Sequence, residues 1–453
     1  MSLKTISLVT SSVAVFFVTF MSSSLNIALP VISREFHTQA ILLSWIVSSF
    51  VLAAAVFSIP FGRIADIIGI KKTFLFGAAI YTTISAVAVF ANSSIMLIVC
   101  RSIQGVGASI IAITAVSLLT MIYPASERGR ALGISIACVY AGSATGPFLG
   151  GILTEHLGWR SIFVVNIPAG LAVILVLLWK IKGEWCECKG ERFDYTGSII
   201  YGLALIALMY GFSLLPQALG GILILAGVIG LLIFIRWEGR SKSPILDPGI
   251  FRDNRAFLFS NLAALTTYSA IFAVGFLISL YLQYNKGLNP EQAGLILIAQ
   301  PVIQTILSPF TGRLSDKIEP RIVASLGMAL ICIGLLLFAF LSPDTSRLYI
   351  MIALVVLGMG FALFSSPNSN AIMSSVTPRF YGVASATMST VRSIGQMLSM
   401  GITMIVMGII IGRVVITPEY YYSYLVSARI AFGVFAALCF GGIFASLSRG
   451  KVR

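Results

Sequence analysis

Charged residues are scarce in this sequence: only 10% of its 453 residues are Asp, Glu, Lys or Arg, whereas 58% are hydrophobic. A soluble domain carries roughly a quarter charged residues, so this composition excludes a water-soluble fold. The short alternating segments of a membrane β-barrel are missing as well. Apolar runs instead recur from Ser7 to Ser446, each long enough for the ~20 residues that cross a bilayer as an α-helix. We therefore predict an all-α integral membrane protein.

Acidic residues and histidines are rarer still, with 16 Asp and Glu against 30 Lys and Arg, and two histidines. The bases are scattered among short loops instead of forming a stripe with aromatics, so we expect no nucleic-acid partner. Neither clustered His nor clustered acids point to a catalytic or metal centre, and we predict neither an enzyme nor a cofactor. The pair Gly450-Lys451 lacks a phosphate-binding loop, which argues against an ATP-driven pump. A channel would need a selectivity filter or a ring of charges, and neither is visible.

Fourteen membrane-spanning helices are predicted from the apolar runs. We place them near residues 7–32, 40–61, 73–91, 95–122, 131–153, 161–181, 197–215, 219–236, 257–284, 291–311, 322–342, 347–373, 383–411 and 425–447. Most Lys and Arg then fall in loops on one side; the loops on the other side hold Arg34, Arg160, Lys286, Arg347 and Arg413. By the positive-inside rule both termini are cytoplasmic, and we expect a multi-pass protein of the cell membrane.

A repeat divides the chain into two related halves. The segment Gly62-Arg-Ile-Ala-Asp66 reappears as Gly312-Arg-Leu-Ser-Asp316, and Gly105-Val-Gly107 recurs as Gly358-Met-Gly360. We predict a six-helix bundle over residues 1–181, two additional helices over 182–256 and a second six-helix bundle over 257–453. Parallel halves of this kind build many secondary transporters, with the substrate site between them at mid-membrane.

The loop that follows the second predicted helix combines glycines, an acid and clustered bases. We predict that Asp66 pairs with Arg128 or Arg130, or lies at a helix N-terminus, and so holds the cytoplasmic side closed. One copy would be read as a turn with topological charge, but the second copy favours a conformational latch. The residues assigned to this latch are Gly62, Asp66, Lys71, Arg128, Arg130, Gly312 and Asp316.

Two further motifs lie inside apolar runs. Arg101 and Gln104 share one face of the fourth helix, where a charge is costly and usually functional, although an arginine near a helix end can also extend to the interface. In the fifth helix, Gly146 and Gly150 are spaced for close helix packing and Pro147 for a bend.

These motifs together resemble those of the major facilitator superfamily. The loop Gly62–Lys72 is similar to its loop signature, the segment Arg101–Ala108 to a motif whose arginine is linked to proton coupling, and Gly142–Gly151 to the signature of its antiporters. Phe193-Asp194-Tyr195, together with segments 158–168 and 237–255, resembles the fourteen-helix drug/proton antiporter family. The resemblance implies proton-coupled export by a monomer.

One position departs from that family. Its members commonly carry an Asp five residues before Asn26, and Met21 stands there. By the predicted spans, every Asp and Glu lies in a loop or at a helix end, whereas Arg101, Arg392 and Arg429 lie within helices. A cationic substrate would find no counter-charge at mid-membrane, and a neutral or anionic one would meet no penalty.

Uncharged polar residues remain as candidates for lining a substrate cavity, or alternatively as interhelical hydrogen bonds. They are Asn26, Asn166, Asn261, Gln300, Gln304, Asn368, Asn370 and Gln396. With Arg101, Gln104 and Arg392 they lead us to predict an exporter of small amphipathic compounds that works by alternating access, coupled to protons by resemblance. The alternative is an exporter of a neutral or anionic metabolite, lipid or peptide that is not proton-coupled through the first helix.

Overall fold

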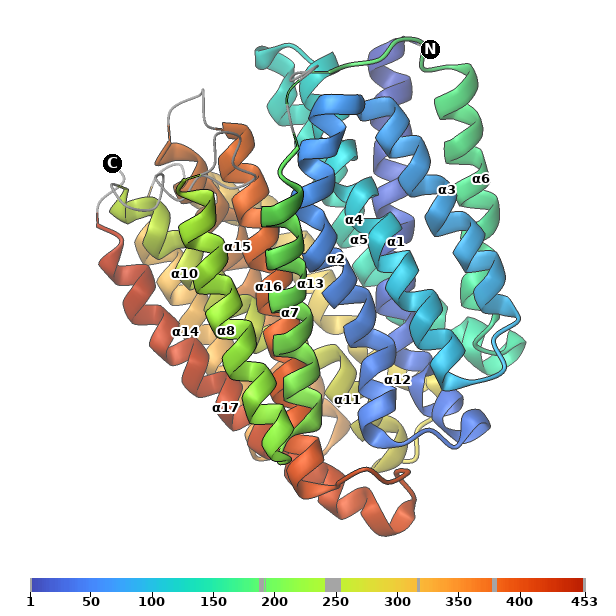
Figure 1. The fold of residues 1–453 in the computed structure, drawn as a ribbon. Helices are drawn as coiled ribbons and strands as arrows, with labels where there is room; N and C mark the ends of the chain where they lie inside the picture. Colours follow the sequence, from blue (N-terminus) through green and yellow to red (C-terminus); the bar gives the residue numbers. More distant parts are fainter. Residues whose placement is uncertain are drawn as a thin grey trace.

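A computed structural model describes residues 2–186, 191, 193–240, 254–315, 318–376 and 381–450. Within this part of the chain, fourteen helices are long and apolar enough to cross a membrane, which confirms the predicted number. The two ends of the chain lie on the same side of the helical bundle (Figure 1). We call this side the terminal side and the other the opposite side.

Most consecutive helices are separated by only a few residues of the chain. The first six spans are α1 (Leu3–Phe36), α2 (Ala40–Ile68), α3 (Ile70–Val89), α4 (Ser94–Ile122), α5 (Ala125–Leu157) and α6 (Ser161–Trp179). Two spans follow, α7 (Tyr195–Leu214) and α8 (Ala218–Glu238). The last six spans are formed by α10 (Arg255–Ile271) with α11 (Val274–Tyr284), α12 (Pro290–Leu297) with α13 (Ala299–Ser315), α14 (Pro320–Ala339), α15 (Arg347–Ser374), α16 (Tyr381–Ile410) and α17 (Tyr421–Ser448), which the 3₁₀ helix η2 (Pro418–Tyr420) precedes.

Two spans that the sequence predicts as continuous helices, residues 257–284 and 291–311, are interrupted near their middle. Between α10 and α11, the backbone N–H of Ala273 donates to Ser399 Oγ of α16 at 3.0 Å. Just after the break between α12 and α13, Pro301 in the first turn of α13 has no N–H to offer the C=O of Leu297, and its ring crowds that carbonyl. Irregular backbone at membrane depth is tolerated where it is enclosed by protein or lines a cavity. We therefore expect each break to be enclosed by other helices or to border a cavity.

The two halves repeat one packing arrangement. A Cβ added to Gly107 of α4 would lie 2.9 Å from the carbonyl oxygen of Gly77 in α3. In the second half, a Cβ on Gly360 of α15 would lie 2.7 Å from the carbonyl oxygen of Gly327 in α14. Each glycine therefore lets two helices approach at backbone distance, and the fourth span packs on the third in both halves.

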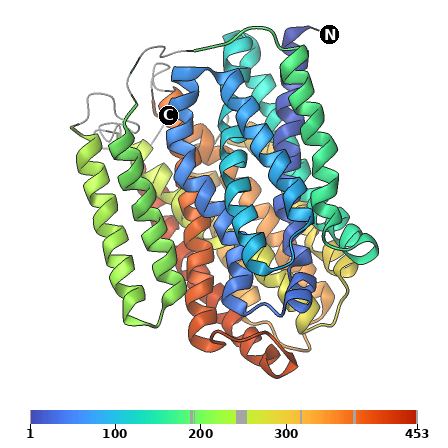
Figure 2. The same ribbon diagram turned by 45° about the vertical axis from the view of Figure 1, so that its right-hand side comes forward.

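The additional helices α7 and α8 form a hairpin at the edge of the bundle (Figure 2). Helix α7 packs against α2 of the first half and α16 of the second, and Tyr201 donates its O–H to the carbonyl of Ala55 at 3.1 Å. Helix α8 packs on α7, where a Cβ on Gly227 would lie 2.8 Å from the carbonyl oxygen of Ala204. The remaining side chains of α8 are largely exposed and apolar, as expected for a surface that faces lipid.

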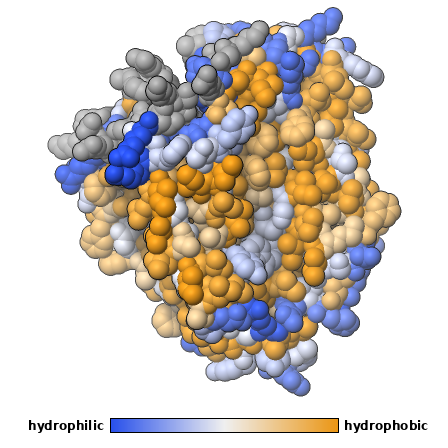
Figure 3. Space-filling view, viewed as in Figure 1, coloured by the Kyte–Doolittle hydropathy of each residue, from blue (hydrophilic) through white to orange (hydrophobic). Residues whose placement is uncertain are grey.

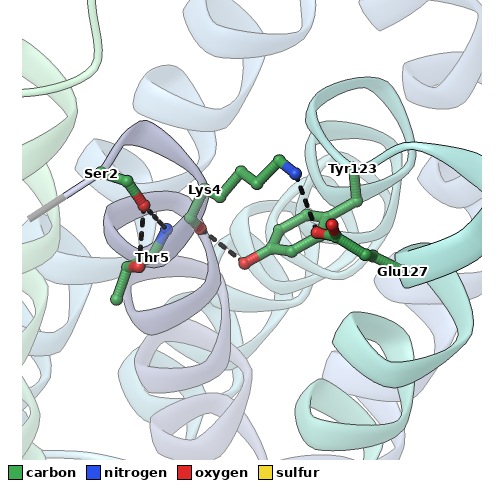
Figure 4. Close-up of polar contacts among 5 residues, drawn as sticks. All are labelled: Ser2, Lys4, Thr5, Tyr123 and Glu127. Carbon is green, nitrogen blue, oxygen red and sulfur yellow. Dashed lines mark hydrogen bonds and ion pairs between the residues drawn. The ribbon is translucent and has the colours of Figure 1, made fainter.

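The surface carries a broad apolar belt, with hydrophilic residues at both ends of the helices (Figure 3). Polar contacts at these ends hold the first bundle together. On the terminal side, Lys4 Nζ donates to Glu127 at 2.8 Å, and the O–H of Tyr123 donates to the carbonyl of Lys4 at 2.9 Å (Figure 4). On the opposite side, Arg160 forms two hydrogen bonds with the carboxylate of Glu35, at 3.1 and 2.7 Å.

Candidate functional site

A cavity of about 240 Å³ lies between the two halves. Helices α1 and α5 form one wall, and α10 to α13, α15 and α16 form the other. Both helix breaks border the cavity, because Phe272, between α10 and α11, and Leu297, the last residue of α12, belong to the lining. The polar and aromatic side chains of the lining are Thr19, Ser22, Ser23, Asn26, Tyr140, Ser143, Tyr268, Phe272, Gln300, Gln304, Phe361, Arg392 and Gln396.

Five of the residues predicted to line a substrate cavity do line this one: Asn26, Gln300, Gln304, Arg392 and Gln396. They come from α1, α13 and α16, which lie far apart in the sequence. Polar side chains within apolar runs were the signal that identified them. Their role in binding stays a prediction.

Hydroxyl-bearing residues of α1 and α5 were missed by the sequence reasoning. Thr19, Ser22 and Ser23 line the cavity together with Asn26. Their spacing of three, four and seven residues places them on one helix face. That spacing was visible in the sequence, but short polar side chains are common in membrane helices and did not stand out.

On the opposite side the two halves are joined. Ser279 Oγ of α11 donates to the carbonyl of Asn26 in α1 at 2.7 Å. Near the surface, His156 Nε2 of α5 lies 3.2 Å from a carboxylate oxygen of Glu291 in α12. These contacts close the cavity toward this side.

The glycine-rich segment of α5 packs closely against neighbouring helices at this closed end. A Cβ on Gly146 would lie 2.6 Å from Ser23 Cβ, and Gly150 approaches α1 equally closely. Across the two halves, a Cβ on Gly294 of α12 would lie 2.2 Å from the carbonyl oxygen of Pro147. No side chain fits at such distances, so glycine is required for this contact.

Toward the terminal side the wall is far more accessible. Helix α11 on the opposite side buries ten of its eleven residues, whereas α13 buries three of seventeen. The terminal half of α5 is also exposed, with Ile136 at 52%. Arg392, which lines the cavity, is exposed as well, and this supports an opening of the cavity toward the terminal side.

Arg392 carries the positive charge of the cavity wall. Its guanidinium carbon lies 5.5 Å from the ring centroid of Tyr268, and that ring packs edge-on against Phe361 at 5.7 Å. Gln396 lies one helical turn further along α16 and also lines the cavity. Among the described residues of the lining there is no carboxylate.

Arg101 and Gln104 lie outside the cavity, in the packed interior of the first bundle. Arg101 is 1% exposed, donates to Gln104 Oε1 at 3.1 Å and stacks on Phe50, whose ring centroid lies 4.0 Å from its guanidinium carbon. Met21 completes the group, because its sulfur accepts the O–H of Tyr81 at 3.0 Å. Met21, which stands where the family commonly carries an Asp, therefore lies in the same buried cluster as Arg101.

The fold and cavity point to a transporter built from two related bundles. The sequence profile of the Major Facilitator Superfamily matches residues 11–184 and 193–400. The chain belongs to this superfamily. A crystal structure of the peptide transporter POT with alafosfalin superposes with a TM-score of 0.73 at 12% identity, covering 98% of this chain and 94% of that one, which shows the shared fold.

Relatives within the superfamily include named exporters and a vitamin transporter. The multidrug resistance protein Stp of Mycobacterium tuberculosis is 31% identical over 404 residues, covering 88% of this chain and 74% of the relative. The cephamycin export protein CmcT of Amycolatopsis lactamdurans is 31% identical over 417 residues, with coverage of 90% and 86%. The riboflavin transporter RibZ of Clostridioides difficile is 30% identical over 397 residues, with coverage of 87% and 86%. This chain is thus a multi-pass transporter of the fourteen-helix type.

In this superfamily member, Asn261 and Asn368 lie in a separate polar cluster near the terminal side. Arg449 donates to Asn368 Oδ1 at 3.1 Å, and Asn368 Nδ2 donates to the carbonyl of Ser260 at 3.2 Å. Asn261 donates to the carbonyl of Phe257 within its own helix at 2.9 Å. These contacts tie α10, α15 and the end of α17 together and leave both amides away from the cavity.

The expected latch does not lie in a loop, because Gly62 and Asp66 belong to the last turns of α2 and Lys71 to the first turn of α3. The segment after α6 contacts this junction. The backbone N–H of Lys71 donates to Glu184 Oε1 at 2.8 Å, where the carboxylate caps the start of α3, and Arg63 forms an ion pair with Glu191. Gly62 has space around it, since an added Cβ would lie 3.7 Å from Ile113.

The remaining parts of the assigned latch are the Asp66 pairing and the second copy at Gly312. Pairing of Asp66 with Arg128 or Arg130 stays a prediction. A Cβ on Gly312 would lie 3.1 Å from the hydroxyl oxygen of Ser366, and Asp316 lies outside the described residues.

Proposed function

We propose that this transporter is a secondary exporter of small amphipathic compounds that works by alternating access. The observation that carries the proposal is the cavity between the halves, closed on the opposite side and accessible from the terminal side. The excess of Lys and Arg in the loops of the terminal side supports a cytoplasmic location for that side. A substrate would then load from the cytoplasm and leave when the halves rock about the cavity.

The lining suits such substrates. Aromatic rings offer an apolar surface, and hydroxyl and amide groups offer both donors and acceptors, as in adaptable small-molecule sites. The names of Stp and CmcT, a multidrug resistance protein and a cephamycin export protein, support export as the direction. Release requires the contact of Gly294 with Pro147 and the contact of His156 with Glu291 to separate.

A second candidate function is favoured by one specific observation. Met21, at the position where the family commonly has an acid, is 0% exposed and lies in the Arg101 cluster, and the described lining of the cavity has no carboxylate. This favours export of a neutral or anionic metabolite, lipid or peptide that is not proton-coupled through α1. The relative RibZ, named as a riboflavin transporter, supports a metabolite as the substrate.

Alternating access can be tested at Gly294. A methyl group there would overlap the carbonyl oxygen of Pro147 only while the opposite side is closed, so Gly294→Ala should shift the population toward an opening on that side. In a background with the six native cysteines replaced, Ser23→Cys in the cavity reports access to a membrane-impermeant maleimide. With the native Gly294, we expect the cysteine introduced at position 23 to be labelled mainly from the cytoplasmic side. With Gly294→Ala, we expect labelling from the outside to rise at least several-fold.

Gly441→Ala in α17 is the matched control, because an added Cβ there meets nothing within 4 Å. It should leave the labelling pattern unchanged. Equal labelling from outside in the Gly294 and Gly441 variants, with both proteins folded, would refute alternating access through this contact.

A further inference from the structure

We propose that this protein exports aromatic organic anions and that the membrane potential alone drives the transport, with Arg392 binding the anionic group. The inference rests on the proposed function and adds to it a substrate class, a residue that determines specificity and an energy source. Three observations support it. Arg392 is exposed in the cavity, aromatic and amide groups surround it, and the described lining contains neither a carboxylate nor an imidazole.

Arg392 is available to a ligand. It is exposed although it lies within a membrane-spanning helix, and it lines the cavity. Among the described residues, Arg392 has an aromatic neighbour, Tyr268, but neither a hydrogen bond nor an ion pair. Its five N–H groups match carboxylate, sulfonate or phosphate oxygens in a fixed planar geometry.

The surroundings of Arg392 suit an aromatic body attached to the anionic group. Tyr268 and Phe361 meet edge to face, with centroids 5.7 Å apart, and a substrate ring can extend this cluster. Toward the closed end, Asn26 Oδ1 is buried without a hydrogen-bond partner among the described residues. A donor on the far end of the substrate would satisfy it.

Charge balance favours anions over cations in the closed cavity. An anion bound to Arg392 gives a neutral pair, whereas a bound cation would add to the existing positive charge. Enclosing an uncompensated charge away from water is costly. Closure of the terminal side is therefore easier with an anionic substrate in place.

The described lining of the cavity contains neither a carboxylate nor an imidazole. The titratable side chains in its described lining are Tyr140, Tyr268 and Arg392. His156 and Glu291 face each other at the closed end and do not belong to the lining.

The membrane potential can replace the proton gradient for such a substrate. A cell interior that is negative expels an anion, with about 2.3 kcal/mol for one charge at 100 mV. That energy corresponds to about a 50-fold concentration ratio. A cation would be opposed by the same potential, so anion export needs no exchanged ion.

Proteoliposomes can separate the potential from a pH gradient. The probes are 2-naphthalenesulfonate, a permanent anion, and (2-naphthylmethyl)trimethylammonium, a permanent cation with the same ring. With an interior-positive potassium diffusion potential of about 100 mV set by valinomycin, we expect the sulfonate to accumulate about 50-fold. A pH gradient at zero potential should produce no accumulation, and the cation should move much more slowly than the anion.

Three variants assign the effect to the guanidinium. Arg392→Gln should slow sulfonate entry at low concentration about tenfold or more, because a charge-assisted hydrogen bond is lost. Arg392→Lys should recover part of the rate. Arg429→Gln, which changes an arginine of α17 that donates to the carbonyl of Ala339 outside the cavity, should transport as the unmodified protein does.

Accumulation that follows the pH gradient, faster movement of the cation, or an unchanged rate in Arg392→Gln would overturn the inference. Failure to move either probe would overturn it as well. The labelling assay at Gly294 requires no substrate and tests alternating access independently. A positive labelling result with a negative probe result would therefore refute this inference alone, whereas failure of the labelling assay would refute the proposed function.

Discussion

Arg101 and Arg392 are both arginines within membrane-spanning helices, yet they lie in opposite surroundings. Arg101 is sealed inside the first bundle, where Phe50 and Gln104 contact its guanidinium group. Arg392 is exposed to the cavity, with Tyr268 as its aromatic neighbour. The comparison teaches that a charge at membrane depth can be sealed in a packed interior or left exposed in a cavity, and only the exposed one is available to a ligand.

The largest expected effect separates the two arginines by stability. Arg101→Ala removes a fully buried side chain and leaves Gln104 Oε1 without its donor, so we expect the free energy of unfolding to fall by about 2–4 kcal/mol. Arg392→Ala removes an exposed side chain and should change it by less than about 0.5 kcal/mol. Thermal unfolding of the two variants in the same detergent measures the difference.

Arg101→Met provides the control for volume. It fills most of the space without a charge and should lose less stability than Arg101→Ala. If Arg101→Ala and Arg392→Ala unfolded at the same temperature, the distinction between a packed and a solvated arginine would be wrong.

A smaller effect is expected from an acid placed beside Arg101. The sulfur of Met21 accepts hydrogen bonds from Tyr81 at 3.0 Å and from Gln104 at 3.9 Å, so Met21→Asp brings a carboxylate into the cluster. Because that carboxylate can accept a charge-assisted hydrogen bond from Arg101, we expect the free energy of unfolding of Met21→Asp to exceed that of Met21→Asn by about 1–3 kcal/mol at neutral pH.

The same pair of variants tests coupling. Transport by Met21→Asp should respond to an imposed pH gradient, and transport by Met21→Asn should not, since only the acid can carry a proton. Flux measurements in proteoliposomes would decide this. Identical stability and identical flux in both variants would show that position 21 does not communicate with Arg101.

The smallest effect concerns the aromatic partners. Phe50→Leu weakens the contact with Arg101 and should lower the free energy of unfolding by about 1 kcal/mol without changing the Michaelis constant of transport. Tyr268→Leu should do the reverse, leaving stability nearly unchanged while raising the Michaelis constant for an aromatic anion about three- to tenfold. Parallel thermal unfolding and initial-rate measurements test both, and an exchange of the two outcomes would contradict the comparison.

The spans were predictable because lipid leaves the backbone no alternative to a helix. The breaks within them were not, because one depends on Ser399 from a distant helix, which caps Ala273. Pro301 was a visible signal for the other break. Proline also occurs inside helices that stay continuous here, such as α1 and α2, so the residue alone does not decide.

The candidate site was predictable in part. Asn26, Gln300 and Gln396 line the cavity, whereas Asn368, equally polar and equally placed in an apolar run, binds Arg449 instead. Periodicity identifies the face of a helix that a residue occupies. It does not identify which neighbour covers that face.

The sequence by itself determined the number of spans, the repeat and the family, because these follow from hydrophobic length and from motifs within continuous segments. Only the tertiary structure decided which polar groups share a cavity, which side is closed and which arginine meets water. The physical reason is that these properties depend on contacts between helices far apart in the chain, such as Gly294 with Pro147, and on the solvent that those contacts exclude.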